Sequence, residues 1–299
     1  MTRAKVIGAA VGVAMIATRV FAQDLTPTQI FEKVQAAYES MQTYKAEGII
    51  TADIDSGTMK MTTETSFSIL LQKPNRYPIS WTQKNVPMPG VAQSGTVWSN
   101  GTQPYLYLGM MNAYSKMGSD DVALASATGI SGGAAFTIPS LFLSVFDGQP
   151  TPFSRLKDPR MEKTEKVGEE DCYVIRGASA TSREEAFWIS KSGNYIVKYY
   201  RSLETPEGGV ATPEMTDKDI EIAIKDMGQE VTEESKQNMR QALKNSEDVR
   251  KTAHLKGSST ELHINISSPE MNAKAFQFAV PEGAALEESL FGGALGGGK

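Results

Sequence analysis

The sequence predicts a mainly β protein with some α-helix (α+β), built on one large antiparallel sheet. From Tyr44 onward, most segments alternate apolar and polar residues or are rich in β-branched and aromatic residues, as half-buried strands are. Short turn sequences separate these segments, namely Asp55-Ser56-Gly57, Lys73-Pro74-Asn75, Asn100-Gly101 and Ser192-Gly193-Asn194. The same alternation predicts a last strand over residues 275–283, which read AFQFAVPEG.

The second predicted strand shows most clearly how the sheet meets a core. Its apolar face carries Phe67, Ile69 and Leu71, and its polar face carries Glu64, Ser66 and Ser68. Such a pattern is typical of an antiparallel strand with one face on a core and the other in water.

A helix is expected before the sheet, and its start is well marked. Thr26 can cap the N-terminus, Pro27 suits the first helical position, and Gln29 completes a capping box. Apolar residues then recur at helical spacing, at Ile30, Val34, Tyr38 and Met41. This apolar face requires a partner surface.

Residues 1–22 predict a secretory signal peptide. Arg3 and Lys5 precede an apolar run that is shorter than the roughly 20 residues of a membrane-spanning helix. Val20-Phe21-Ala22 then suits a signal peptidase. We expect cleavage after Ala22, export to the periplasm of a Gram-negative bacterium, and a single domain over residues 23–299 without an integral membrane segment.

Composition and charge exclude several classes of function. The formal net charge of −5 and the pI near 5.3 give no basic footprint, so no nucleic-acid partner is expected. The single Cys172 cannot form an internal disulfide, and its strand-like context EEDCYVIRG predicts a buried, unreactive thiol. Because the two histidines lack metal-ligand spacing and no Cys-x-x-Cys exists, we expect no metal and no cofactor.

Two stretches interrupt the sheet pattern. Residues 110–153 carry few charges, and residues 203–256 form a helical insertion. In the insertion, Thr216 and Thr232 each start a helix, and the apolar stripe of the second helix is thin. A solvated helical hairpin laid across the sheet is one interpretation, and an arm that binds an envelope protein is the other.

The first interruption contains a motif that resembles a catalytic one. Gly129-Ile130-Ser131-Gly132-Gly133 matches the G-x-S-x-G elbow of serine hydrolases. The only candidate bases are His254 and His263, one at the end of a charged helix and one in a late strand. Since no strand–helix alternation builds a hydrolase sheet, we expect no enzyme, and a serine hydrolase using Ser131 is only a remote alternative.

An unusually apolar segment follows this motif. Its sequence, AAFTIPSLFLSVF, carries no charge, and Pro139 can begin a helical turn that places Leu141, Phe142, Val145 and Phe146 close together. It is either a core helix that plugs one end of the sheet or a lid over an apolar cavity. In the second case Gly129, Gly132 and Gly133 serve as its hinge.

The order of these features resembles a known superfamily. A helix leads into SGTMKMTTETSFSILLQKPNRYPISWTQ, the VWSNGTQPYLYL hairpin follows, then FWISKSGNYIVKYYR, and FQFAVPEGA ends the pattern. The chain resembles the periplasmic outer-membrane lipoprotein carriers and receptors of the LolA/LolB type, and more closely a branch of predicted periplasmic proteins that share this layout. The resemblance implies an unclosed antiparallel half-barrel whose concave apolar face is covered by helices and takes up acyl chains.

Together these observations lead to one functional hypothesis and one alternative. The hypothesis is a non-catalytic periplasmic carrier that binds a lipid or the acyl chain of a lipoprotein. Its expected lining residues are Phe67, Ile69, Leu71, Trp81, Phe136, Leu141, Phe142, Val145 and Phe146. The alternative is an envelope scaffold or stress sensor that binds another protein through residues 203–256.

Overall fold

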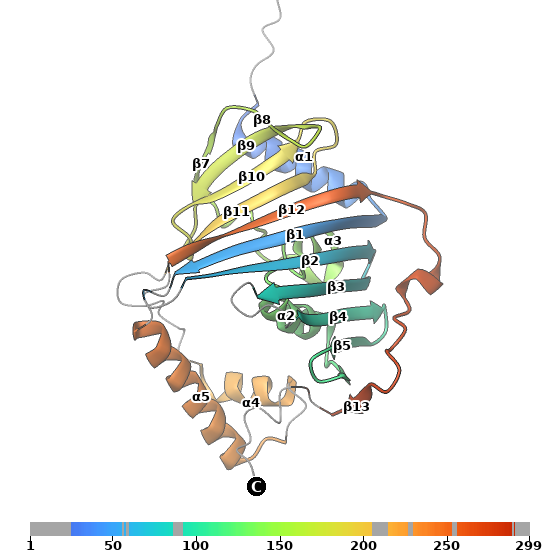
Figure 1. Ribbon diagram of the computed structural model, residues 1–299, viewed down its shortest axis with the longest axis vertical. Coiled ribbons are helices and arrows are strands. Elements are labelled where there is room, and N and C mark those ends of the chain that lie inside the picture. Colours follow the sequence, from blue (N-terminus) through green and yellow to red (C-terminus); the bar gives the residue numbers. More distant parts are fainter. Residues whose placement is uncertain are drawn as a thin grey trace, which may run out of the picture.

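The strands form one open sheet, as Figure 1 shows. The computed structural model describes residues 25–55, 57, 60–85, 92–204, 215–226, 230–252, 256–288 and 290, so the expected signal peptide lies outside the described residues. The strand order is β13-β6-β5-β4-β3-β2-β1-β12-β11-β10-β9-β7, with β8 paired to β9 outside this path. The predicted α+β class with an unclosed sheet is confirmed.

The strands and helices have the following bounds. The strands are β1 Thr43–Asp55, β2 Lys60–Gln72, β3 Arg76–Asn85, β4 Ala92–Asn100, β5 Pro104–Leu108, β6 Ala113–Lys116, β7 Lys157–Met161, β8 Glu165–Val167, β9 Glu170–Ala178, β10 Glu185–Ser190, β11 Ile196–Glu204, β12 Lys256–Ser267 and β13 Ala285–Glu287. The helices are α1 Pro27–Ser40, α2 Asp120–Ile130, α3 Pro139–Phe142, α4 Asp217–Asp226 and α5 Glu233–Thr252, with 3-10 turns η1 Ser144–Phe146 and η2 Ala273–Phe276.

Helix α1 forms as its sequence predicts. Thr26 caps it, and both hydrogen bonds of the capping box with Gln29 are present. Ile30, Val34 and Tyr38 are buried on the face that meets the inner side of the sheet. Phe31 stacks on Phe153 with 4.3 Å between ring centroids, which ties the helix to the chain leading into β7.

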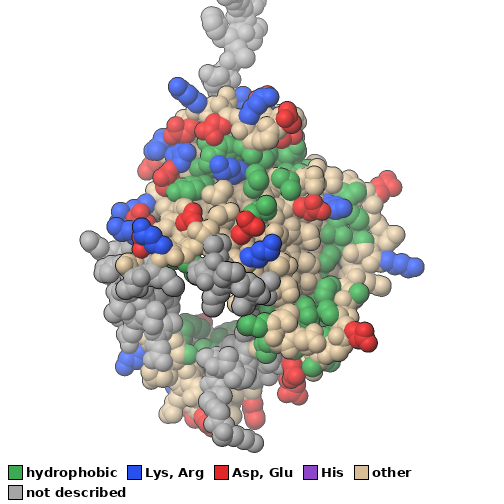
Figure 2. Space-filling view, in the orientation of Figure 1, with side chains coloured by type: hydrophobic (Ala, Val, Ile, Leu, Met, Phe, Trp, Pro, Cys, Tyr) green, Lys and Arg blue, Asp and Glu red, His purple; other side chains and the backbone are tan. Residues whose placement is uncertain are grey.

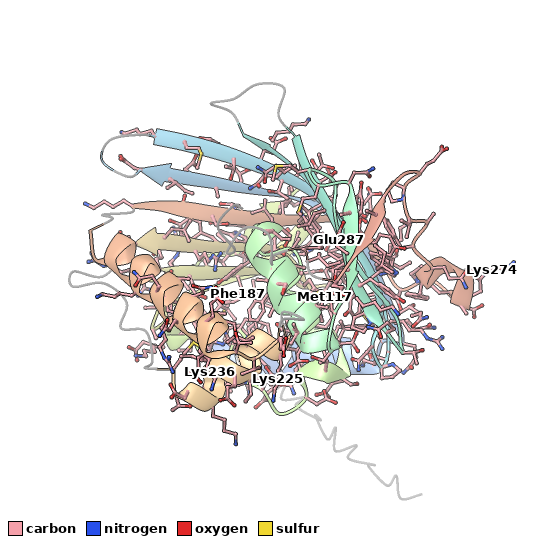
Figure 3. The ribbon with its side chains drawn as sticks, turned by 90° about the horizontal axis from the view of Figure 1, so that it is seen from below. Met117, Phe187, Lys225, Lys236, Lys274 and Glu287 are labelled. Atoms are coloured by element: carbon pink, nitrogen blue, oxygen red, sulfur yellow. The ribbon has the colours of Figure 1, made fainter. Side chains whose placement is uncertain are left out.

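The inner side of the curved sheet holds the main core. On β2, Phe67, Ile69 and Leu71 are buried, while Glu64, Ser66 and Ser68 are exposed, so the predicted faces of this strand are confirmed. Figure 3 looks along the sheet from its end and shows α2 lying inside the curve. The helices α1, α2 and α3 therefore cover one face, and the other face is the outer one (Figure 1).

A row of two aromatic residues flanked by two glycines crosses the sheet from β1 to β4. Gly48 pairs with Phe67, Phe67 with Trp81, and Trp81 with Gly95. The Phe67 ring lies over Gly48, where an added Cβ would be 2.2 Å from its Cζ atom, and Trp81 lies in the same way over Gly95. The missing side chains of the two glycines thus make room for the two rings.

The prediction of a last strand over residues 275–283 is wrong. Phe276 ends η2, and the segment after it is not a strand. The physical reason is that β12 already pairs with β1 on one side and β11 on the other, so it has no free edge for a following strand. Instead, Phe278 packs on Trp98 of β4, with 4.5 Å between the ring centroids.

The two edges of the sheet differ in construction. At one edge, β13 adds to β6 in parallel, in a sheet that is otherwise antiparallel. At the other edge, β7 reads Lys-Asp-Pro-Arg-Met, and its register with β9 shifts between Lys157 and Arg160. Asp158 within this irregularity has a φ of 48°. A charged, proline-containing and bulged edge strand is a poor template for a further strand.

The outer face carries a small cluster of its own over β9, β10 and β11. Cys172, Val174, Ala186, Trp188 and Val197 are buried there. The burial raises the pKa of the Cys172 thiol to about 11, with Glu170 adding to the effect, so the thiol is unreactive at neutral pH. Figure 2 looks onto the outer face, where acidic and basic side chains are interspersed.

The insertion lies between β11 and β12. The predicted N-caps of helices α4 and α5 are present. Asp219 N donates a hydrogen bond to Thr216 Oγ1, and Ser235 N donates one to Thr232 Oγ1. Glu204 of β11 and Lys256 of β12 face each other as paired residues, so the insertion leaves and rejoins the sheet at one point. Figure 1 shows α4 and α5 below the sheet and away from its strands, which corrects the expectation that they lie across it.

Candidate functional site

The apolar segment lies on the inner face of the sheet, and we call residues 132–146 the lid. Helix α2 ends at Ile130, and the chain then turns through Gly132 and Gly133, whose φ angles are 71° and 116°. Pro139 begins the short helix α3, as the sequence predicts, and η1 follows. Ile138, Phe142 and Leu143 are each at most 3% exposed, so the lid is closed against the sheet.

The structure places most of the expected lining residues together in this core. Five of them are buried, namely Phe67, Ile69, Leu71, Trp81 and Phe142. Three more, Leu141, Val145 and Phe146, are partly buried and pack against the same cluster. Phe136 is set apart: it borders a pocket, and its ring lies 5.0 Å from the guanidinium carbon of Arg155.

The C-terminal end of the lid is held by the turn between β2 and β3. Ser144 N donates to the carbonyl oxygen of Pro74 (3.1 Å), and Val145 N donates to Asn75 Oδ1 (2.9 Å). In the same turn, Lys73 Nζ donates to the carbonyl oxygens of Tyr38 and Glu39 at the C-terminus of α1, at 2.9 and 2.6 Å. The Lys-Pro-Asn turn therefore joins α1, the sheet and the lid.

The N-terminal end of the lid borders a partly enclosed pocket. This pocket has a volume of about 490 Å³ and lies between Gly132–Thr137 and the ends of β10, β11 and β12. The side chain of Thr137 crosses to the sheet and donates to Glu261 Oε2 at 2.6 Å. The volume falls within the range of roughly 300–1,000 Å³ that is usual for small-molecule sites.

Strand β12 presents its polar side chains to the inside. Ser259, Glu261 and His263 are at most 6% exposed, whereas Ile264, which alternates with them, is 43% exposed. This reverses the usual arrangement of a half-buried strand. A strand that turns polar residues inward breaks a local rule of folding, and such positions are commonly functional.

The inward polar groups are incompletely satisfied. His263 Nε2 lies 2.8 Å from Glu261 Oε1, which is an ion-pair distance, but the two atoms form no hydrogen bond. Both ring nitrogens of His263, Glu261 Oε1 and the Tyr44 hydroxyl have no hydrogen-bond partner among the described residues. Unpaired buried polar groups cost roughly 1–3 kcal/mol each, so these four atoms lower the stability of the core.

A second buried carboxylate lines the same pocket. Glu185 of β10 is 7% exposed, and its Oε2 accepts a hydrogen bond from the hydroxyl of Tyr199 at 2.8 Å. Burial is the main cause that raises the pKa of Tyr199, and the charge of Glu185 adds to it, so Tyr199 stays protonated and donates. Tyr199 also pairs with Glu261 across the strands, so the two carboxylates flank this tyrosine.

The structure gives Ser131 a structural role. It follows a helix rather than a strand, so the strand–turn–helix of a nucleophile elbow is absent here. Its side chain is fully buried, and its Oγ accepts a hydrogen bond from Ala135 N at 3.3 Å. His254, one of the two candidate bases, lies outside the described residues, and no metal-binding cluster of acidic, His or Cys residues occurs among those described.

The three expected hinge glycines differ in conformation, which predicts different responses to alanine. Gly129 lies within α2 with open space around it, so Gly129→Ala should stabilise the protein by about 0.5–1 kcal/mol. Gly133 has a φ of 116° and also faces open space, so Gly133→Ala should destabilise it by about 1–3 kcal/mol through backbone strain alone. Urea unfolding of both variants measures the difference, and equal effects would contradict a turn that requires glycine at position 133.

Sequence reasoning missed the polar half of this site. Glu185, Glu261 and Thr137 were not expected there, and His263 was weighed only as a catalytic base. The alternation of β12 is compatible with either face of the strand pointing inward. Hydrophobicity alone would place the apolar residues Leu262 and Ile264 inside. The usable signal was local: Glu261 and His263 alternate with Leu262 and Ile264, so one of the two sets had to face inward.

Comparisons with solved structures find distant similarities, some within the superfamily that the sequence resembles. LprF from Mycobacterium bovis is 10% identical with a TM-score of 0.41, over 81% of this chain and 93% of that one. A LolA superfamily protein from Nitrosomonas europaea is 9% identical with a TM-score of 0.30, over 85% and 99%. The MucA/MucB complex of Pseudomonas aeruginosa gives 10% identity and 0.29, over 57% and 49%. We draw no conclusion from similarities of this strength.

A comparison with curated proteins finds no match at a significant level. Within the described part of the chain, no helix is long and apolar enough to cross a membrane.

The family model described as a predicted periplasmic protein (DUF2092) matches residues 28–211, which is more than half of the chain. The protein therefore belongs to this family of predicted periplasmic proteins.

Proposed function

We propose that the protein is a non-catalytic periplasmic carrier of a Gram-negative bacterium that binds an apolar ligand, a lipid or the acyl chain of a lipoprotein. The observation that carries the proposal is the lid, an uncharged apolar segment that fills the hollow of an open sheet. An acyl chain that displaced the lid would meet the same apolar side chains. Burying each of them against ligand carbon is worth roughly 1.5–3 kcal/mol, so a few contacts suffice for binding.

The way in which the lid is attached supports opening at one end. Two backbone hydrogen bonds hold residues 144 and 145 to the Lys-Pro-Asn turn. At the other end, Gly132 and Gly133 permit rotation, and the Thr137–Glu261 hydrogen bond lies beside the pocket. Because the C-terminal end of the lid is fixed and its N-terminal end contains two glycines, the lid opens at its N-terminal end, beside the pocket.

Binding of a fluorescent fatty-acid probe tests the proposal. The wild-type protein should bind the probe saturably, and a variant with two glutamates in the lid should not. A wild-type protein without saturable binding would contradict the carrier and leave the lid as a core plug.

The second candidate function is a scaffold or sensor that binds an envelope protein through the insertion. Helix α4 favours it, because Ile222 is 47% exposed and Met215, just before the helix, is 38% exposed. The pair of helices is held together by Lys236 with Glu221 (2.6 Å) and by Arg240 with Asp217 (2.6 Å). A self-supporting pair of helices with exposed apolar side chains suits contact with another protein.

Deletion of the insertion separates the two functions. Because Glu204 and Lys256 are paired, residues 205–255 can be replaced by Asn-Gly, which makes β11 and β12 an ordinary hairpin. None of the described side chains of α4 and α5 belongs to the main core, so a cooperative thermal melt should remain. Retained probe binding supports the carrier, lost capture of an envelope protein supports the scaffold, and loss of folding would contradict an independent insertion.

A further inference from the structure

We propose that the pocket beside the lid is a head-group site that binds a primary ammonium group of the ligand. This inference rests on the proposed carrier function and names the polar end of the molecule that is carried. The site is formed by Glu185, Glu261, Tyr199 and Thr137, which all line the pocket of about 490 Å³. Phe187 lies two residues after Glu185 on β10 and therefore on the same face of the strand, and Figure 3 shows Phe187 inside the curve of the sheet.

The balance of buried charge is the first argument. Glu185 and Glu261 are 7% and 4% exposed, and no Lys or Arg among the described residues forms an ion pair with either of them. Each accepts a hydrogen bond from an uncharged hydroxyl, of Tyr199 and Thr137 respectively. Among the described residues, His263 is the base that approaches Glu261, and one imidazole cannot serve as the counterion of both carboxylates. Buried carboxylates without a counterion are unfavourable, and a bound cation removes that cost.

The second argument is the Glu261 oxygen that forms no hydrogen bond. Glu261 Oε1 is buried and lies 2.8 Å from His263 Nε2 without a hydrogen bond, and the Glu261 side chain lines the pocket. An ammonium group carries three donors, and each of the two carboxylates and the hydroxyl oxygen can accept at least one of them. Hydrogen bonds of this kind, between two charged groups, are about twice as strong as neutral ones.

The rim of the pocket determines which cations can enter. Arg155, Lys157 and Arg201 stand at the rim with exposed side chains and form no ion pair with the buried carboxylates. Positive side chains at the entrance repel a multiply charged cation more strongly than a single ammonium group, because the electrostatic energy grows with the charge of the ligand. The site therefore suits an amine-bearing amphiphile rather than a polyamine.

The experiment compares three probes of equal chain length: dodecylamine, dodecanol and dodecanoate. At neutral pH the wild-type protein should bind dodecylamine at least about tenfold more tightly than dodecanol, because the amine forms charge-assisted hydrogen bonds. The double variant Glu185→Gln with Glu261→Gln should lose this preference and keep its affinity for dodecanol. Glu64→Gln, on the exposed face of β2, is the matched control and should leave all three affinities unchanged.

The outcomes separate this inference from the carrier function. Equal affinity of the wild type for amine and alcohol, or a preference that survives in the double variant, overturns the head-group site and leaves the carrier intact. A second measurement needs no long chain: butylamine should shift the NMR signals of the His263 ring beside Glu261, and butanol should not. If butylamine shifts them while no dodecyl probe binds, only the carrier function fails, and if butylamine does not shift them, the head-group site fails.

Discussion

Replacing Leu141 and Phe142 together by glutamate is expected to abolish binding of a fluorescent fatty-acid probe while leaving a folded protein. Phe142 is 3% exposed and packs near Tyr44, with 6.2 Å between ring centroids. A carboxylate at this position would face mostly apolar surface, and Lys73, whose Nζ lies 5.1 Å from the Phe142 ring centroid, already donates to two carbonyl oxygens of α1. The free energy of unfolding should fall by about 3–5 kcal/mol.

A matched variant in the sheet distinguishes a lid from a plug. A lid can lift and expose its charges to water, whereas a strand in the middle of the sheet cannot. Ile69→Glu with Leu71→Glu places two charges on β2, where both side chains are at most 1% exposed, and this variant should not fold. Circular dichroism and thermal melts compare the two. If the lid variant unfolds as completely as the β2 variant, residues 132–146 are a plain part of the core.

Gly48→Ala is expected to destabilise the sheet strongly through a single added methyl group. The new Cβ would lie 2.2 Å from the carbonyl oxygen of Leu262 and 2.2 Å from Cζ of Phe67. The Phe67 ring could rotate away, but the backbone of β12 cannot move without breaking its pairing with β1. We expect a loss of at least about 3 kcal/mol of stability.

Gly118→Ala is the control for this substitution. Nothing lies within 4 Å of a Cβ at Gly118, and its φ is not positive, so its stability should change by no more than about 0.5 kcal/mol. Urea unfolding measures both variants. Similar midpoints for the two would show that β1 and β12 are looser than this packing implies.

Local sequence rules predicted the parts of the fold that local physics determines. The cap at Thr26, the two faces of β2 and the helical turn at Pro139 each depend on neighbours within a few residues. The prediction of a strand over residues 275–283 was wrong for the opposite reason. Its alternation was strand-like, but its structure depends on whether a sheet edge is free, and that edge is set by residues far away in the chain.

The candidate site was predicted in its apolar half only. Phe67, Trp81 and Phe142 follow from hydrophobicity, and the structure gathers them on the inner face, although no ligand contact is established for them. Glu185 and Glu261 come from strands about 75 residues apart, and only the pairing of β10, β11 and β12 brings both to one pocket. The proximity of two residues on strands so far apart in the chain cannot be predicted from the local pattern of a single sequence.

The construction of the two sheet edges bears on how the protein behaves at high concentration. Open sheets polymerise when an unpaired edge recruits the same edge of another molecule. Here β13 occupies one edge, and the bulge and Pro159 of β7 disrupt the other. The C-terminal segment that carries β13 therefore covers the edge of β6, and a chain shortened before Ala285 should expose that edge and aggregate more readily than the full chain.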